Sequence, residues 1–151
     1  MSNWRTAMKE VEIGQGRLVR EGKDMAILSI GHVGNYAIEA AEKLADEQIS
    51  AAVYDMRFVK PLDKALLMEV FEKFDKVITI EDGCLMGGFG SAIVEFMTDN
   101  GYKSKVKRLG IPDEIIEHGT QLELHKQCGF DPDGIYQSAL QLIDESVSTI
   151  K

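Results

Sequence analysis

The sequence predicts a three-layer α/β/α protein of the α/β class, with a mostly parallel sheet between two layers of helices. Short β-branched segments alternate along the chain with amphipathic helical segments. Residues 25–30 form a continuous apolar run closed by Gly31, which is typical of a central strand covered on both faces. At 151 residues the chain fits one domain, 1–151, and it shows no internal repeat.

The first half of the chain contains two strand and helix units. Apolar residues recur at helical spacing from 37 to 45, which predicts an amphipathic helix after the first strand. Residues 49–55 then predict a second strand. Asp63 is placed to cap a helix whose buried side comprises Leu66, Leu67, Val70, Phe71 and Phe74.

The residues before the first of these strands do not follow the alternation. We expect residues 1–15 to form an irregular N-terminal extension. Residues 16–20 could add an edge strand, and an antiparallel orientation would suit their position before the turn at Glu21 and Gly22.

The second half begins with a strand at 77–80, followed by a glycine-rich turn. The next helix carries Ile93 and Phe96 on its apolar side and ends at Asn100 and Gly101. A short strand follows at 106–109. The tail is helical: residues 120–123 fit a capping box, Gly129 can end that helix, and residues 131–132 begin a final one.

Composition and charge exclude several classes of function. The formal net charge of −8 argues against nonspecific binding to nucleic acids or anionic membranes. The cations at 103–108 alternate with other residues, which predicts a strand with a solvated face. No apolar run approaches the roughly 20 residues of a membrane span, and the N-terminus lacks the apolar core of a secretory signal. A cytoplasmic location is therefore expected.

The glycine-rich segment that joins the strand at 77–80 to the next helix is the main candidate site. Helix N-termini present unpaired N–H groups and a positive dipole end, so such a turn can bind an anion. The candidates for an anion-binding or interface loop, here and at the neighbouring strand ends, are His32, Arg57, Glu81, Asp82, Gly87, Gly88, Gly90 and Ser91.

Two acids stand in front of the glycines, and adjacent residues at a strand end point in opposite directions. We expect Asp82 to accept hydrogen bonds from backbone amides of the turn. Glu81 is expected to pair with a cation such as Arg57 at the end of the preceding strand.

The histidines and cysteines give weaker signals. The loop at 31–34 could cradle a phosphate around His32, although tight turn geometry also explains its glycines. His125 and Cys128 would share a helix face, with His118 nearby, but zinc needs further ligands that the sequence does not place there. Cys84 and Cys128 are expected to be reduced thiols.

Five segments occur in an order that resembles transketolase C-terminal domains, most closely those of 1-deoxyxylulose-5-phosphate synthases. They are RFVKPLD at 57–63, TIEDG at 79–83, MGGFGS at 86–91, LGIPDE at 109–114 and EHGT at 117–120. The resemblance runs from about residue 11 to 142. It implies a five-stranded mixed sheet whose first strand is antiparallel.

The resemblance also implies a parent enzyme that uses thiamine diphosphate and magnesium to condense pyruvate with glyceraldehyde 3-phosphate, in isoprenoid precursor biosynthesis. Such enzymes are homodimers of three-domain chains, in which the first two domains hold cofactor, metal and substrate. The third contributes to assembly. The metal and diphosphate motif of thiamine enzymes is absent here, because Glu81 replaces its first glycine and Asn100 is too close to be its asparagine.

We therefore expect no catalytic, cofactor-binding or metal-binding residue in this chain, which would be inactive without the remaining domains, its partners. Two alternatives stay open: a docking domain of a 2-oxoacid dehydrogenase β-subunit, and a freestanding domain that binds small ligands with its glycine loops. Trp4, Met8, Met56 and Phe58 could cover a partner domain, but core packing explains Met56 and Phe58 as well.

Overall fold

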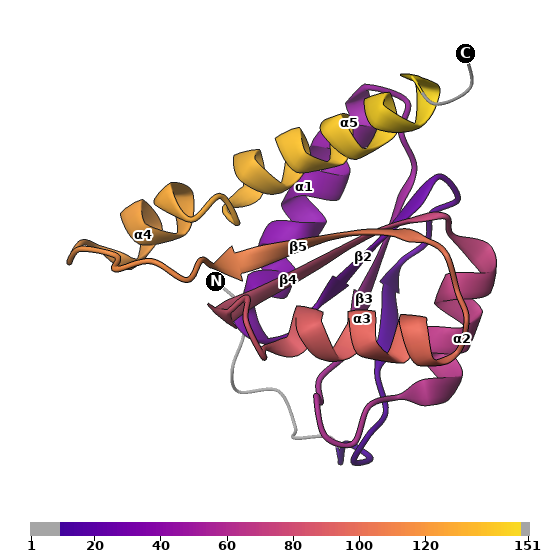
Figure 1. The fold of residues 1–151 in the computed structure, drawn as a ribbon. Helices are drawn as coiled ribbons and strands as arrows, with labels where there is room; N and C mark the ends of the chain where they lie inside the picture. Colours follow the sequence, from indigo (N-terminus) through magenta and orange to yellow (C-terminus); the bar gives the residue numbers. More distant parts are fainter. Residues whose placement is uncertain (1–9, 149–151) are drawn as a thin grey trace.

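The computed structural model describes residues 10–148, with side chains up to residue 144. A five-stranded sheet lies between two layers of helices (Figure 1), which confirms the α/β/α prediction. The strand order is β1-β3-β2-β4-β5. β1 is antiparallel to β3, and the other neighbouring strands are parallel.

The strands are β1 (Arg17–Arg20), β2 (Met25–Ser29), β3 (Ala51–Asp55), β4 (Lys76–Cys84) and β5 (Lys105–Ile111). The helices are α1 (Gly34–Asp46), preceded by the 3-10 turn η1 (Gly31–Val33), then α2 (Lys64–Lys73), α3 (Phe89–Asp99), α4 (Gln121–Gln127) and α5 (Pro132–Ser148). None of the helices within residues 10–148 is both long and apolar enough to cross a membrane.

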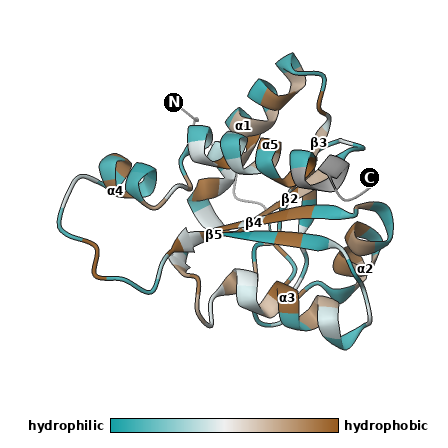
Figure 2. Cartoon of the chain, turned by 45° about the horizontal axis from the view of Figure 1, so that its top comes forward, coloured by the Kyte–Doolittle hydropathy of each residue, from teal (hydrophilic) through white to brown (hydrophobic). Residues whose placement is uncertain are grey.

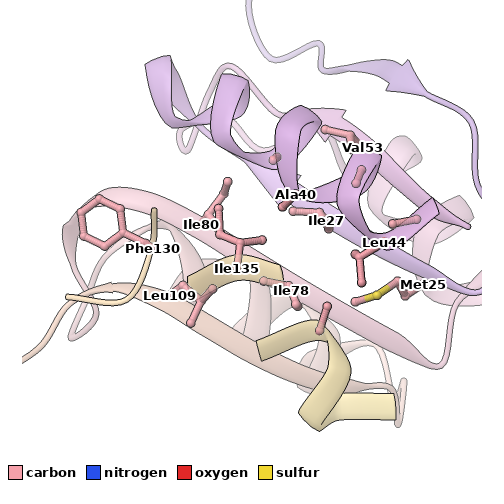
Figure 3. Close-up of a cluster of buried hydrophobic side chains, with 14 of the residues drawn as sticks. Met25, Ile27, Ala40, Leu44, Val53, Ile78, Ile80, Leu109, Phe130 and Ile135 are labelled. Atoms are coloured by element: carbon pink, nitrogen blue, oxygen red, sulfur yellow. The ribbon is translucent and has the colours of Figure 1, made fainter. Parts of the chain in front are cut away.

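One face of the sheet packs against α1 and α5. Ile27 of β2 and Ile78 of β4 are fully buried there, against Leu44 of α1 and Ile135 of α5 (Figure 3). Burying each such side chain contributes roughly 1.5–3 kcal/mol. This cluster holds the last helix against the centre of the sheet.

The other face packs against α2 and α3. Leu28 and Val77 of the central strands meet Phe71 of α2 and Phe89 of α3. Met56 is fully buried in the same cluster, so core packing is its role, whereas Phe58 is half-buried. Trp4 and Met8 lie outside the described residues. In Figure 2 hydrophobic residues follow the central strands, and they alternate with hydrophilic ones along β5 as predicted.

The capping residues behave as the sequence predicts. Asp63 accepts a hydrogen bond from the amide of Leu66 (3.0 Å), and its other oxygen accepts one from the amide of Gly16 (2.9 Å). Thr120 and Glu123 form a complete capping box at α4. Asp63 thereby joins the start of α2 to the segment that leads into the edge strand β1.

β4 is longer than predicted. It continues through the acidic pair to Cys84, with an irregular register against β5 between Ile80 and Cys84. The predicted strand at 77–80 therefore ends four residues too early. Residues 10–16, ahead of β1, contain no helix or strand, and the remainder of the expected extension lies outside the described residues.

The topology places two strand ends together at the carboxyl edge of the sheet. β2 is followed by α1 on one face, whereas its neighbour β4 is followed by α3 on the other face. Ligands of open α/β sheets bind at such a switch point, because the diverging connections leave a crevice there. The loops after β2 and β4 are therefore where a site is expected.

Candidate functional site

The start of α3 is bound by an acid from the strand that precedes it. Glu81 is only 6% exposed. Its Oε2 accepts a hydrogen bond from the amide of Phe89 (2.7 Å), and its Oε1 accepts one from the amide of Gly90 (2.8 Å). These are the free amides that a helix N-terminus would otherwise offer to an anion. We call this pair of bonds the Glu81 clamp.

The roles expected of the two acids are therefore wrong. Glu81, not Asp82, satisfies backbone amides, because β4 continues to Cys84 and its alternation turns Glu81 towards α3. Arg57 does not pair with Glu81. Its Nε lies 3.8 Å from Asp55 Oδ2, at the end of β3, and its φ is +58°. The prediction that the two acids point in opposite directions is confirmed.

The glycines let α3 approach β4 closely. A Cβ at Gly88 would overlap the carbonyl oxygen of Cys84 and the carboxylate of Glu81. A Cβ at Gly90 would lie 2.6 Å from Thr79 Oγ1. Gly87 has φ +71°, in the left-handed region that favours glycine. The glycine pattern thus serves the clamp and the strand-to-helix turn.

A second set of hydrogen bonds holds the loop between β4 and α3. Arg108 Nη1 donates to the carbonyl oxygen of Leu85 and to Ser91 Oγ, both at 2.8 Å. Ser91 Oγ donates to the same carbonyl (2.8 Å) and accepts from the amide of Gly87 (3.1 Å). The sequence did not predict this role of Arg108. It showed Arg108 only as one of the cations in the alternating segment at 103–108.

Asp82 lies on the opposite side of β4 and meets two histidines. Its Oδ2 is 3.6 Å from His32 Nε2 and 3.4 Å from His125 Nε2. His125 is 4% exposed, and its Nδ1 lies 3.3 Å from Tyr36 Oη. We call His32, Asp82 and His125 the His–Asp–His cluster. Its three donor atoms lie within 4.8 Å of one another.

The sequence did not predict this cluster. It placed His125 with His118 and Cys128, on the basis of helical spacing alone. The partner of His125 is decided instead by how α4 packs beside the end of β4. The available signal was that His32 follows β2 and Asp82 lies near the carboxyl end of the neighbouring parallel strand β4, so that both reach the same edge of the sheet.

Two cavities have Asp82 in their walls. One, of about 510 Å³, lies along the glycine loop and is also lined by His32, Val59 and Met86. The other, of about 560 Å³, lies against α4 and is also lined by His125 and Cys128. Burial, with a smaller effect from the nearby Asp82, raises the pKa of the Cys128 thiol, so this cysteine is a poor nucleophile at neutral pH.

The eight predicted residues therefore divide into separate groups. Glu81 and Gly90 take part in the clamp, and Gly88 leaves the space that the Glu81 carboxylate occupies. Gly87 and Ser91 belong to the Arg108 network. His32 and Asp82 belong to the His–Asp–His cluster, and Arg57 pairs with Asp55.

Comparison with known proteins relates this chain to one region of larger proteins. The family model described as transketolase, C-terminal domain, matches residues 14–135. The 1-deoxy-D-xylulose-5-phosphate synthase of Cytophaga hutchinsonii is 61% identical over 142 residues, which are 94% of this chain and 22% of that protein. The synthase of Parabacteroides distasonis is 50% identical over 135 residues, which are 89% of this chain and 21% of that protein. The chain thus spans about a fifth of the length of these relatives.

Solved structures agree on the fold. A split-gene transketolase, described as an inactive "beta4 tetramer", superimposes with a TM-score of 0.84 at 30% identity, over 90% of this chain and 44% of that one. A transketolase from Pichia stipitis superimposes with a TM-score of 0.64 at 18% identity, over 87% of this chain and 18% of that one, which shows a shared fold alone.

Proposed function

Because this chain belongs to the transketolase C-terminal domain family, we propose that it is the C-terminal assembly domain of a thiamine diphosphate-dependent 1-deoxy-D-xylulose-5-phosphate synthase. The parent enzyme would condense pyruvate with glyceraldehyde 3-phosphate for isoprenoid precursor biosynthesis. Cofactor, magnesium and substrate would be held by the other domains. Identity of 61% to a synthase over nearly the whole chain supports this choice of parent.

The Glu81 clamp is the observation that carries the proposal. The glycine loop has the form of a diphosphate cradle, but the amides of Phe89 and Gly90 are already bonded to a buried carboxylate. A diphosphate would have to displace Glu81 and approach its negative charge in a site of low dielectric, which is unfavourable. The residues of this loop therefore do not fit thiamine diphosphate, and no catalytic step is assigned to them.

Exposed apolar side chains support an assembly role. Met86 is 67% exposed at the glycine loop, and Val59 is 39% exposed beside it. Ile115 is 98% exposed in the segment between β5 and α4, and Leu122 is 69% exposed on α4. Residues of this kind at one edge of a sheet are typical of a surface that another domain covers. We assign that surface to the preceding domains of the parent enzyme.

The proposal predicts that the chain has no synthase chemistry of its own. The purified chain should release no carbon dioxide from pyruvate with thiamine diphosphate and magnesium, while the full-length Cytophaga hutchinsonii synthase, assayed in parallel, should. Calorimetric titration with thiamine diphosphate should give no saturable heat. Decarboxylation by the chain alone would overturn the proposal. Saturable binding of a phosphate or nucleotide would favour a freestanding ligand-binding domain, and capture of a lipoyl-enzyme would favour a docking domain.

A further inference from the structure

We propose that the His–Asp–His cluster binds a divalent transition metal ion of the zinc type. Its donors come from three separate places in the chain. His32 lies in the turn after β2, Asp82 near the end of β4, and His125 on α4. Two of the three histidines in the sequence point their Nε2 atoms at one carboxylate oxygen. The inference does not depend on the identity of the parent enzyme.

The distances fit metal ligation better than direct hydrogen bonding. Zinc bonds of about 2.0–2.2 Å to nitrogen and oxygen place the donors of a tetrahedral site about 3.3 Å apart. The two measured separations from Asp82 Oδ2 are 3.4 Å and 3.6 Å. Charge-assisted hydrogen bonds are shorter, at about 2.7–2.9 Å. Two of the three donor separations are thus close to the spacing that an ion requires, and all three donor atoms lie within 4.8 Å of one another.

The surroundings of His125 suit a histidine that ligates a metal ion. Its Nδ1 lies 3.3 Å from Tyr36 Oη, so a proton on Nδ1 can be donated to that oxygen. The lone pair of Nε2 then faces Asp82 and is available to an ion. Metal-ligating histidines usually have their second nitrogen held in this way. Ring contacts with Tyr36 and Phe130 hold the buried imidazole from its sides.

The cluster also has the position and openness of a site that exchanges its ion. It lies at the switch point between β2 and β4, where open α/β sheets bind ligands. The side chains of His32 and Asp82 are 52% and 32% exposed, so water can complete the coordination. The amide of Gln121 lies 3.5 Å from His32 Nε2, too far to hold that nitrogen firmly.

The donor set selects the type of ion. Two imidazole nitrogens and one carboxylate suit zinc and similar transition metals, whereas magnesium and calcium prefer oxygen ligands. A bound ion would connect α4 to the ends of β2 and β4. Thermal stability should therefore rise with zinc concentration, because the ligand binds the folded state.

The test uses the untagged 151-residue chain, stripped with a chelator and dialysed. Calorimetric titration with Zn²⁺ should give a stoichiometry of one ion per chain. Co²⁺ should produce the visible absorption bands that are typical of a site with a low coordination number. Mg²⁺ should produce no saturable heat. His32→Ala and Asp82→Ala should each weaken Zn²⁺ binding at least about 10-fold, since loss of a supporting contact alone weakens metal sites about 10–100-fold.

His118→Ala is the matched control, because His118 is an exposed histidine outside the cluster. It should leave the affinity for Zn²⁺ unchanged. Far-ultraviolet circular dichroism should show that all three variants fold, as expected for exposed positions. The proposal is wrong if the wild-type chain shows no saturable Zn²⁺ binding. It is equally wrong if both cluster variants bind Zn²⁺ as tightly as wild type, or if His118→Ala reduces binding as much as they do.

Discussion

Glu81→Gln tests the clamp with a change of one atom. In the wild-type chain the two carboxylate oxygens each accept one amide of α3, at 2.7 Å and 2.8 Å. A glutamine offers one oxygen, and its NH₂ group would face the other amide, donor against donor. The variant also lacks the negative charge at the N-terminus of α3.

The expected effect follows from these losses. A hydrogen bond to a charged group contributes about 1.5–3 kcal/mol, and a buried unsatisfied N–H costs about 1–3 kcal/mol. Part of this loss in stability is offset, because burying a neutral amide costs less desolvation free energy than burying a carboxylate. We expect Glu81→Gln to lower the free energy of unfolding by about 2–4 kcal/mol. For a chain of this length, that is a fall of about 4–16 °C in Tm.

Urea unfolding, followed by circular dichroism in the presence of a chelator, measures this difference. Asp82→Asn is the matched control: the same acid-to-amide change at the next residue, on a side chain that is 32% exposed. It should change the free energy of unfolding by about 0.5 kcal/mol or less. If Glu81→Gln and Asp82→Asn destabilise the chain equally, the clamp does not hold α3 and our reasoning fails.

Two further predictions concern local packing and pH. Gly88→Ala should lower the free energy of unfolding in urea by about 3 kcal/mol, because the added Cβ would overlap Glu81 and displace the clamp. Gly101→Ala is the control: Gly101 has φ +76° and nothing within 4 Å of its Cβ, so this change should cost about 1 kcal/mol. Equal losses in the two variants would contradict this prediction. Hydrogen bonds from the Thr120 hydroxyl and, to a smaller extent, from the Thr120 amide lower the pKa of Glu123. The Glu123 carboxylate therefore stabilises α4 fully above its unfolded pKa of about 4.3, and this stabilisation is lost as pH falls through its pKa in the folded chain. In an NMR titration Thr120→Ala should return the Glu123 pKa towards its usual value, and an unchanged pKa would refute the capping role.

The sequence predicted those parts of the fold that depend on local patterns. The apolar run of β2 is buried as expected, Asp63 caps α2, and Gly129 takes a positive φ at the end of α4. These features depend on residues close together in the sequence. The antiparallel β1 was expected chiefly from the resemblance, and its pairing with β3 confirms it.

The site could be predicted only in part, because its contacts join distant segments. The glycine pattern correctly located the turn, but the length of β4 determined which acid faced α3, and periodicity did not give that length. Arg108 and His125 reach the site from β5 and α4. Their roles depend on how those elements pack beside β4, which no local pattern encodes.

Reconstitution in trans tests the assembly role most directly. A fragment of the Cytophaga hutchinsonii synthase that lacks the region matched by this chain would be produced. This fragment would then be mixed with this chain. We predict a stable complex in analytical ultracentrifugation, and synthase activity that neither piece shows alone. Two folded pieces that sediment separately and stay inactive when mixed would contradict the account.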